Sequence, residues 1–233
     1  MRQNFPTQEW ITPSHASTAP PTVLFIFFSF TNQTRRVVSA MADVFRSRGW
    51  NVEEAAIVMA DERYPLPFPW RPFWRHLLGW IPPQLLDRRC DITVPPHITA
   101  ASASYDLICI GSPTWWLLPA LPISSFLHGE SARRLLEGRP FAVFAVARSL
   151  WWLNAWRVAA LARRCGGRHV ASRGFVFPGN QLQSFASLAC YLRTGASPSR
   201  WWGLPLHPYG LTSEGLLAAR RFATELASHP DNR

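Results

Sequence analysis

The chain has 233 residues, 48% of them hydrophobic, which is enough to build the buried core of one α/β domain with insertions. Its formal net charge is +10, and all 24 basic residues are arginine, so Schiff-base lysines and the Gly-Lys-Ser/Thr signature of P-loop NTPases are excluded. The four cysteines indicate neither a zinc site nor a disulfide framework, and they favour a reducing cytoplasm.

The N-terminal part of the chain predicts a leader followed by a strand, a helix and a second strand. Residues 1–21 are polar and rich in Pro, Ser and Thr, and we expect them to form a flexible leader to a single domain over residues 22–230. The continuous apolar run Val23–Phe28 predicts a strand that is buried on both faces. Apolar residues at helical spacing predict a helix over Thr34–Arg48, and Trp50–Val58 predicts the next strand.

A segment rich in proline and aromatic residues then interrupts the alternation. Tyr64–Pro83 holds six prolines and six aromatic residues, so we expect regular structure only in a short helix near Phe73–Leu78. We interpret this segment as part of an insertion over about 62–100, serving as a lid or a docking surface. A second insertion is expected over about 180–210.

The rest of the chain predicts strands alternating with helices. Phe141–Ala162 is apolar enough to raise the question of a membrane span, but Arg148 and Arg157 within it favour a strand and a helix that separate near Arg148. Five alternating strands predict an α/β fold, a three-layer sandwich with a mostly parallel sheet. The remaining expected strands are Tyr105–Ile110, Phe141–Ala147 and His169–Phe177, and the expected helices are Pro119–Leu136, Asn154–Cys165, Leu182–Leu192 and Thr212–Ala227.

Three loops follow strands of this predicted sheet, and ligands of such sheets bind beyond the carboxyl ends of the strands. The loops span residues 29–34, 111–118 and 147–154. In the first loop the hydroxyls of Ser29, Thr31 and Thr34 lie next to a helix N-terminus, whose free N–H groups attract anions. This pattern predicts either an anion site or simple capping of the helix by Thr31 or Asn32.

Each of the other two loops carries a pair of adjacent tryptophans. In the second loop, either one of Trp115 and Trp116 stacks on a flat heteroaromatic ligand, or both pack under a neighbouring loop. In the third loop, Arg148 faces either a negative charge on a ligand or an internal carboxylate.

The three loops, in this order, resemble the phosphate loop and the two ring-binding loops of the flavodoxin family. The family's phosphate loop reads Ser/Thr-x-Thr-Gly-x-Thr, and residues 29–34 read Ser-Phe-Thr-Asn-Gln-Thr. Residues 105–127, YDLICIGSPTWWLLPALPISSFL, resemble the family's Gly-Ser-Pro-Thr-Tyr-Trp loop and the helix after it. The resemblance runs from about Val23 to Phe177, and it implies a five-stranded parallel sheet in the order 2-1-3-4-5 and FMN as the cofactor.

The resemblance also implies which residues bind the cofactor. The FMN phosphate would be held by Ser29, Phe30, Thr31, Asn32, Gln33 and Thr34. The isoalloxazine ring would lie along Ser112, Pro113, Thr114, Trp115 and Trp116, with Arg148 and Ser149 on its other side. Asn32 stands where the family usually has Gly, and Asn tolerates a left-handed backbone better than most residues.

A narrower resemblance involves the Pro/aromatic insertion together with the Ser-Pro-Thr-Trp loop that follows it. This combination is similar to flavodoxin-fold proteins labelled dialkylresorcinol condensing enzymes. That similarity implies a bacterial pathway in which two fatty-acyl-derived β-keto units are joined into an aromatic lipid.

Three functions therefore stay open: an FMN-dependent oxidoreductase or electron carrier, a biosynthetic enzyme acting on acyl or β-keto substrates, and a non-catalytic binder of an anionic membrane or nucleic acid. The net charge favours an acidic protein partner, either a redox partner or an acyl carrier protein, and allows peripheral membrane contact. The arginines form no long basic run, so we expect no nucleic-acid partner. No residue is assigned a catalytic role, because the seven histidines make no metal-ligand pair and a Gly-x-Ser-x-Gly elbow is absent.

Overall fold

The computed structural model describes residues 19–64, 75, 78–79, 81–86, 88–99, 104–179, 181–196, 200–201, 204–205 and 207–228. The predicted leader and the helix expected near Phe73–Leu78 lie almost wholly outside these residues. β1 begins at Thr22, directly after the expected leader.

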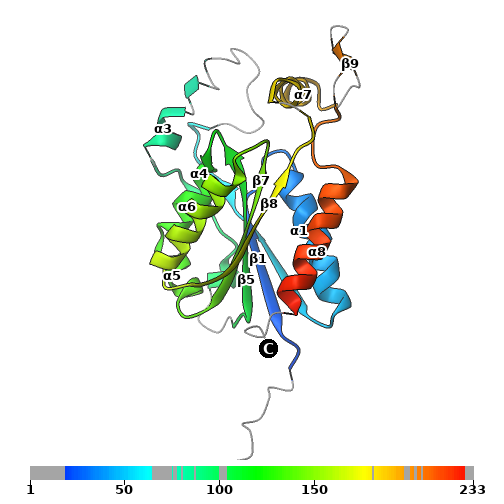
Figure 1. Ribbon diagram of the computed structural model, residues 1–233. Coiled ribbons are helices and arrows are strands. Elements are labelled where there is room, and N and C mark those ends of the chain that lie inside the picture. Colours follow the sequence, from blue (N-terminus) through cyan, green and yellow to red (C-terminus); the bar gives the residue numbers. More distant parts are fainter. Residues whose placement is uncertain are drawn as a thin grey trace, which may run out of the picture.

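The centre of the described structure is a parallel sheet (Figure 1). Its strands lie in the order β2 (Asn51–Ala56), β1 (Thr22–Phe27), β5 (Leu107–Trp115), β7 (Pro140–Ala147) and β8 (Arg168–Val176). Numbered along the chain, this order is 2-1-3-4-5, the flavodoxin-like order. The predicted fold class is therefore confirmed.

Helices cover both faces of the sheet (Figure 1). On one face lie α1 (Gln33–Ser47) and α8 (Ser213–Ala227). On the other face lie α4 (Leu121–Leu127), α5 (Glu130–Leu136) and α6 (Trp151–Arg164). The segment Pro119–Leu136 is largely helical, as expected, but it forms two helices because the chain turns between α4 and α5 at His128 and Gly129. There the N–H of Gly129 donates to the carbonyl of Phe126 at 2.9 Å in place of a continuing helical bond.

Two core layers result from the alternation of side chains along the strands. In β1, the side chains of Phe25 and Phe27 pack towards α1 and α8, whereas those of Leu24 and Ile26 pack towards α4 and α6. All four are fully buried. This explains the unbroken apolar run of the first strand, since a central parallel strand needs apolar residues on both sides.

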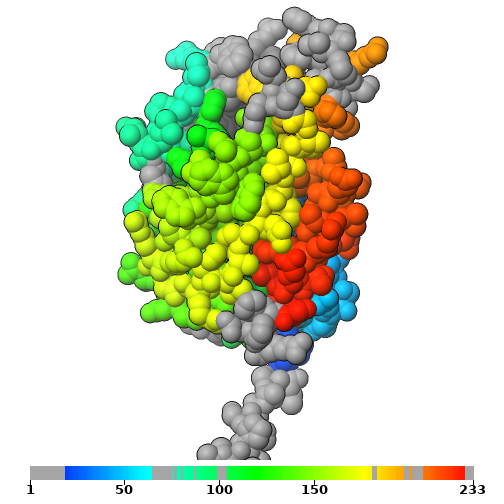
Figure 2. All heavy atoms as spheres, in the orientation of Figure 1, coloured from blue at the N-terminus to red at the C-terminus, as the bar shows by residue number. Residues whose placement is uncertain are grey.

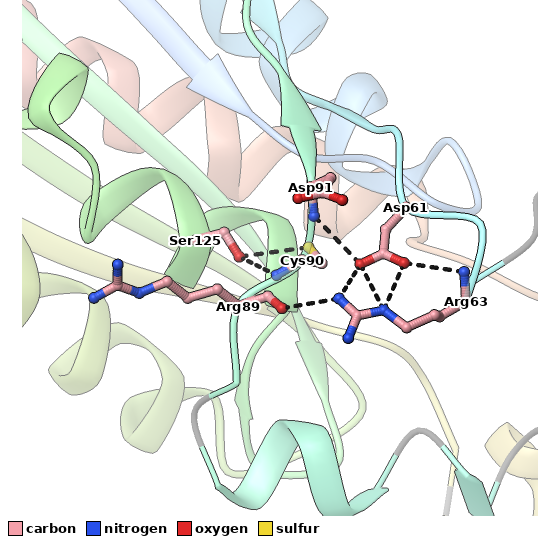
Figure 3. Close-up of polar contacts among 6 residues, drawn as sticks. All are labelled: Asp61, Arg63, Arg89, Cys90, Asp91 and Ser125. Carbon is pink, nitrogen blue, oxygen red and sulfur yellow. Dashed lines mark hydrogen bonds and ion pairs between the residues drawn. The ribbon is translucent and has the colours of Figure 1, made fainter.

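Part of the first insertion forms a small unit that is pinned to the fold by polar contacts (Figure 3). β3 (Val58–Met59) pairs antiparallel with β4 (Ile92–Thr93). Between them, the buried carboxylate of Asp61 accepts hydrogen bonds from the guanidinium and backbone N–H of Arg63 and from the N–H of Asp91.

A second contact joins this unit to α4. The backbone N–H of Cys90 donates to the hydroxyl of Ser125 at 2.9 Å (Figure 3). Nearby, α3 (Ile81–Leu85) is held to the short strand β6 (Leu118–Pro119) by the buried side chain of Gln84, whose amide donates to the carbonyl of Pro119.

The remaining described elements are the 3-10 helix η1 (Pro96–Thr99), α7 (Gln181–Thr194), β9 (Arg200–Trp201) and β10 (Leu204–Pro205). α7 confirms the helix expected over Leu182–Leu192, and it lies beyond the carboxyl ends of the strands (Figure 1). The hydroxyl of Thr212 caps α8 by accepting from the N–H of Gly215 at 3.3 Å. None of the helices within the described residues is long and apolar enough to cross a bilayer.

Candidate functional site

A cavity of about 120 Å³ opens where β1, β5 and β7 end. This volume is roughly ten times the cavity volume that one water molecule needs. Residues from all three predicted loops line it, and so do residues of α7 and of the segment before α8. The lining residues are Phe30, Thr31, Gln33, Thr34, Pro113, Thr114, Trp115, Trp116, Val146, Ala147, Arg148, Phe177, Phe185, Leu188, Leu192 and Tyr209.

The first wall is the N-terminus of α1. Asn32 precedes the helix with φ 62° and ψ 0°, so it adopts the left-handed backbone that its position in the motif predicts. Its side chain makes no capping bond. Instead, the hydroxyl of Ser29 accepts from the N–H of Arg35 at 3.2 Å. Within the described part of the chain, the N–H groups of Gln33 and Thr34 have no partner, and Thr34 lies at the buried base of the cavity.

Two side chains of this loop bind the segment before α8. The hydroxyls of Thr31 and Tyr209 are hydrogen-bonded at 2.7 Å. The side-chain carbonyl of Gln33 accepts from the N–H of Leu211 at 3.1 Å. Burial raises the pKa of Tyr209 to about 12, so its phenol stays protonated at neutral pH. Gln33 therefore contributes its backbone rather than its side chain to the anion-attracting end of the helix.

The second wall is a hairpin, where the sequence predicted a loop over 111–118. β5 continues through Trp115 and pairs back with β6, so that Trp115 faces Leu118. The prediction ended the strand too early because the pairing partner that extends it comes from later in the chain. Trp115 packs edge-on against Phe28 and Phe30, with ring centroids 5.6 and 5.8 Å apart.

The residues predicted in this segment divide into two groups. Pro113, Thr114, Trp115 and Trp116 line the cavity. Ser112 does not line it: it is fully buried, and its hydroxyl donates to the carbonyl of Pro113 at 3.3 Å.

The third wall contains Arg148. Its guanidinium lies over the ring of Phe185 at 5.3 Å, and burial lowers the pKa of the Arg148 side chain. No carboxylate among the described residues pairs with it. Ser149 follows Arg148 but is not among the residues that line the cavity.

The tryptophan pair of the third loop lies in a helix rather than in a loop. α6 begins at Trp151, three residues before the predicted start. The ring of Trp151 covers the backbone of Gly174 in β8, where an added Cβ would come within 2.1 Å of the ring. Trp151 therefore packs on the sheet and does not reach the cavity.

Sequence reasoning missed the fourth wall. Phe185, Leu188 and Leu192 of α7 line the cavity together with Phe177 and Tyr209. The ring of Tyr209 stacks on that of Tyr191, with centroids 4.7 Å apart. The available signal was an apolar helix directly after the last strand, but its spacing alone does not indicate which element it faces.

Neither a protein-family model nor a curated protein matches the sequence. Among solved structures, a flavoprotein in complex with FMN from Lactobacillus acidophilus has 18% identity over 66% of this chain and 93% of its own, with a TM-score of 0.49. A flavodoxin from the domain Archaea has 11% identity over 88% of this chain and 96% of its own, with a TM-score of 0.48.

A flavodoxin of Streptococcus pneumonia TIGR4 has 13% identity over 89% of this chain and 99% of its own, with a TM-score of 0.46. The fold assignment of this chain rests on the strand order of its own sheet.

The chemistry that the cavity offers is hydrogen-bond donation, positive charge and aromatic surface. No cluster of His, Cys, Asp or Glu that could hold a metal ion occurs among the described residues. Cys109 lies in β5, shortly before the residues of that strand that line the cavity. It is fully buried, and burial raises the pKa of its thiol far above the usual value. The arrangement therefore suits a ligand that carries an anionic group and a flat ring.

Proposed function

We propose that this chain is an FMN-binding flavoprotein that acts in oxidoreduction or electron transfer. One observation carries the proposal: the open N-terminus of α1, the aromatic hairpin and Arg148 converge on one cavity at the carboxyl ends of the strands. Each feature alone has a structural explanation. Their combination matches a ligand with a phosphate at one end and a flat ring at the other.

The residues present fit the phosphate. The N–H groups of Gln33 and Thr34 and the hydroxyl of Thr34 are the donors that would hold it, and Asn32 already has the backbone conformation that directs them. The N-terminus of α1 contributes its dipole as well, which favours an anion. Thr31 and Tyr209 would bound the same site through their shared hydrogen bond.

The ring would lie between the hairpin and the third wall. Trp115 and Trp116 offer aromatic surface, and Arg148 offers a positive charge to the ring. When bound, the flavin supplies one- or two-electron chemistry. The chain's own residues bind and orient it and exclude water, and Arg148 favours whichever redox form carries more negative charge.

The decisive test is FMN binding by the purified chain. We expect a yellow protein, or a colourless one that takes up added FMN and quenches its fluorescence. Thr34→Val should weaken FMN binding at least tenfold, because it removes a buried donor to the phosphate. Riboflavin, which lacks the phosphate, should bind both forms equally.

The matched control is Thr224→Val on α8, which lies away from the cavity and should leave FMN affinity unchanged. A chain that neither carries flavin nor takes up FMN or riboflavin would overturn the proposal.

The apolar wall of α7 favours a second candidate. Phe185, Leu188 and Leu192 cover one side of the cavity with hydrocarbon, which suits an alkyl or acyl chain. The candidate is a biosynthetic enzyme of the dialkylresorcinol type that receives β-keto substrates from an acidic acyl carrier protein. It predicts that a β-ketodecanoyl thioester binds and that Leu188→Gln weakens this binding; failure of the thioester to bind would refute it.

A further inference from the structure

One third of the chain carries positive charge only. Between Glu137 and Glu214 there is no Asp or Glu, although the stretch covers β7, α6, β8 and α7. It contains the nine arginines 139, 148, 157, 163, 164, 168, 173, 193 and 200. This third of the chain therefore contributes +9 of the total net charge of +10, and it includes α6 and residues of the cavity.

Large apolar side chains are exposed on α6 and on the neighbouring β5–β6 hairpin. Trp152 and Trp156 of α6 are 54% and 64% exposed, and Leu150, just before the helix, is 43% exposed. At the tip of the β5–β6 hairpin, Trp116 and Leu117 are 39% and 44% exposed. We call these five residues the tryptophan patch.

The elements that carry the patch are neighbours, because α6 packs against both β5 and β6. In Figure 2 the outer side of α6 lies at the surface, and no other described element covers it on the face shown. The inner side of α6 already packs on the sheet through Ala155, Val158 and Ala162. Trp152 and Trp156, four residues apart, therefore share an outward face that the core does not need.

Two members of the patch have an unusual backbone. Trp116 has φ 58° and Leu150 has φ 48°, a left-handed conformation that is rare for large apolar residues and energetically unfavourable. Trp116 also lines the cavity, whereas Leu150 immediately precedes α6. Retained strain of this kind is typical of functional surfaces.

We propose that the tryptophan patch docks the protein on an anionic membrane surface. Tryptophan prefers the boundary between water and hydrocarbon, and helices that lie in that boundary combine Trp and Leu with arginine. Arg163 and Arg164 end the same helix, and Arg168 begins the neighbouring strand. A bilayer presents anionic groups over a broad plane, which suits arginines that are spread along elements rather than gathered in one pocket.

The experiment uses the full chain and vesicles, without added flavin. In a sedimentation assay, we expect binding to vesicles of phosphatidylcholine with 30% phosphatidylglycerol, and at least tenfold weaker binding to phosphatidylcholine alone. The double variant Trp152→Gln/Trp156→Gln should bind the anionic vesicles at least tenfold more weakly than the unaltered chain.

Two matched controls distinguish binding through the patch from non-specific hydrophobic binding and from general electrostatic attraction. Leu217→Gln replaces an equally exposed apolar residue on α8 and should bind as the unaltered chain does. Arg164→Gln should weaken binding several-fold, whereas Arg221→Gln, an exposed arginine on α8, should weaken it less.

A measurement on the unaltered chain tests the proposal even if the double variant fails to fold. Brominated acyl chains should quench the tryptophan fluorescence of the unaltered chain on anionic vesicles, because the patch enters the interface. Failure of the chain to bind these vesicles at low salt, or equal binding by the double variant and Leu217→Gln, would overturn the proposal. FMN binding is measured separately, so its failure does not affect this outcome.

Discussion

At the scale of single residues, Asn32 decides the shape of the anion-attracting loop. Its left-handed backbone is the conformation that Gly adopts freely and that a β-branched residue adopts only at a cost. We expect Asn32→Gly to change the free energy of unfolding by less than about 0.5 kcal/mol and Asn32→Val to lower it by about 1–2 kcal/mol. Urea unfolding of the two variants checks this. Equal stability of the Val variant would mean that the loop adopts another conformation.

Asp61 makes the stability of the first insertion depend on acid. The Arg63 guanidinium holds the pKa of the Asp61 carboxyl at about 2, below its usual value of 3.8. Because the folded pKa is depressed, this contribution to stability is complete above about pH 4 and is lost as the pH falls towards 2.

The corresponding prediction compares Asp61→Asn with the parent chain. The variant should be less stable at pH 6, and the difference in urea midpoint should shrink between pH 4 and pH 2.5. Glu130→Gln, which alters an exposed carboxylate on α5, is the control and should show no such convergence. A difference that stays constant over this range would show that the ion pair does not stabilise the fold.

At the scale of elements, the packing of α6 on β8 depends on the absence of a side chain at Gly174. The ring of Trp151 occupies the space where a Cβ would stand. Gly174→Ala should therefore lower the free energy of unfolding by about 1–3 kcal/mol through overpacking. In a double-mutant cycle, Trp151→Ala should absorb part of this loss. Additive effects of the two changes would contradict the contact.

The elements also show what the sequence could and could not predict. Local patterns predicted the strands and most helices, because apolar periodicity reflects burial on one or both faces. The hairpin of β5 and β6 was missed, since strand pairing there depends on residues from Thr114 to Pro119 meeting each other rather than on periodicity. The sequence predicts the pair Trp151-Trp152 in a loop, because the expected helix starts only at Asn154, whereas in the structure both lie in α6, one packed on Gly174 and the other facing solvent.

The candidate site was predictable in its three loops and unpredictable in its fourth wall. Thr31, Thr34 and Trp115 lie where the motif order places them. Tyr209 is 178 residues away from its partner Thr31, and no local pattern connects the two. Contacts of this kind arise only from the complete topology, in which α8 lies beside α1.

At the scale of the whole molecule, the charge asymmetry should govern how fast an anionic ligand arrives. Arg148 and α7, which line the cavity, belong to the acid-free third of the chain, and salt screens such fields over about 10 Å at 0.1 M. We expect the association rate of FMN to fall about tenfold between 10 mM and 0.5 M salt in stopped-flow quenching. Riboflavin, which carries no phosphate, should be nearly insensitive, and an equal salt effect on both ligands would contradict electrostatic steering.

The bonds from Thr31 to Tyr209 and from Gln33 to Leu211 also set an order of events during synthesis. The loop that precedes α1 is synthesised 178 residues before Tyr209, whose hydroxyl fixes the side chain of Thr31. A nascent chain can therefore assemble most of its sheet while this loop still lacks its final partners. The loop reaches its final arrangement only after the segment before α8 has left the ribosome.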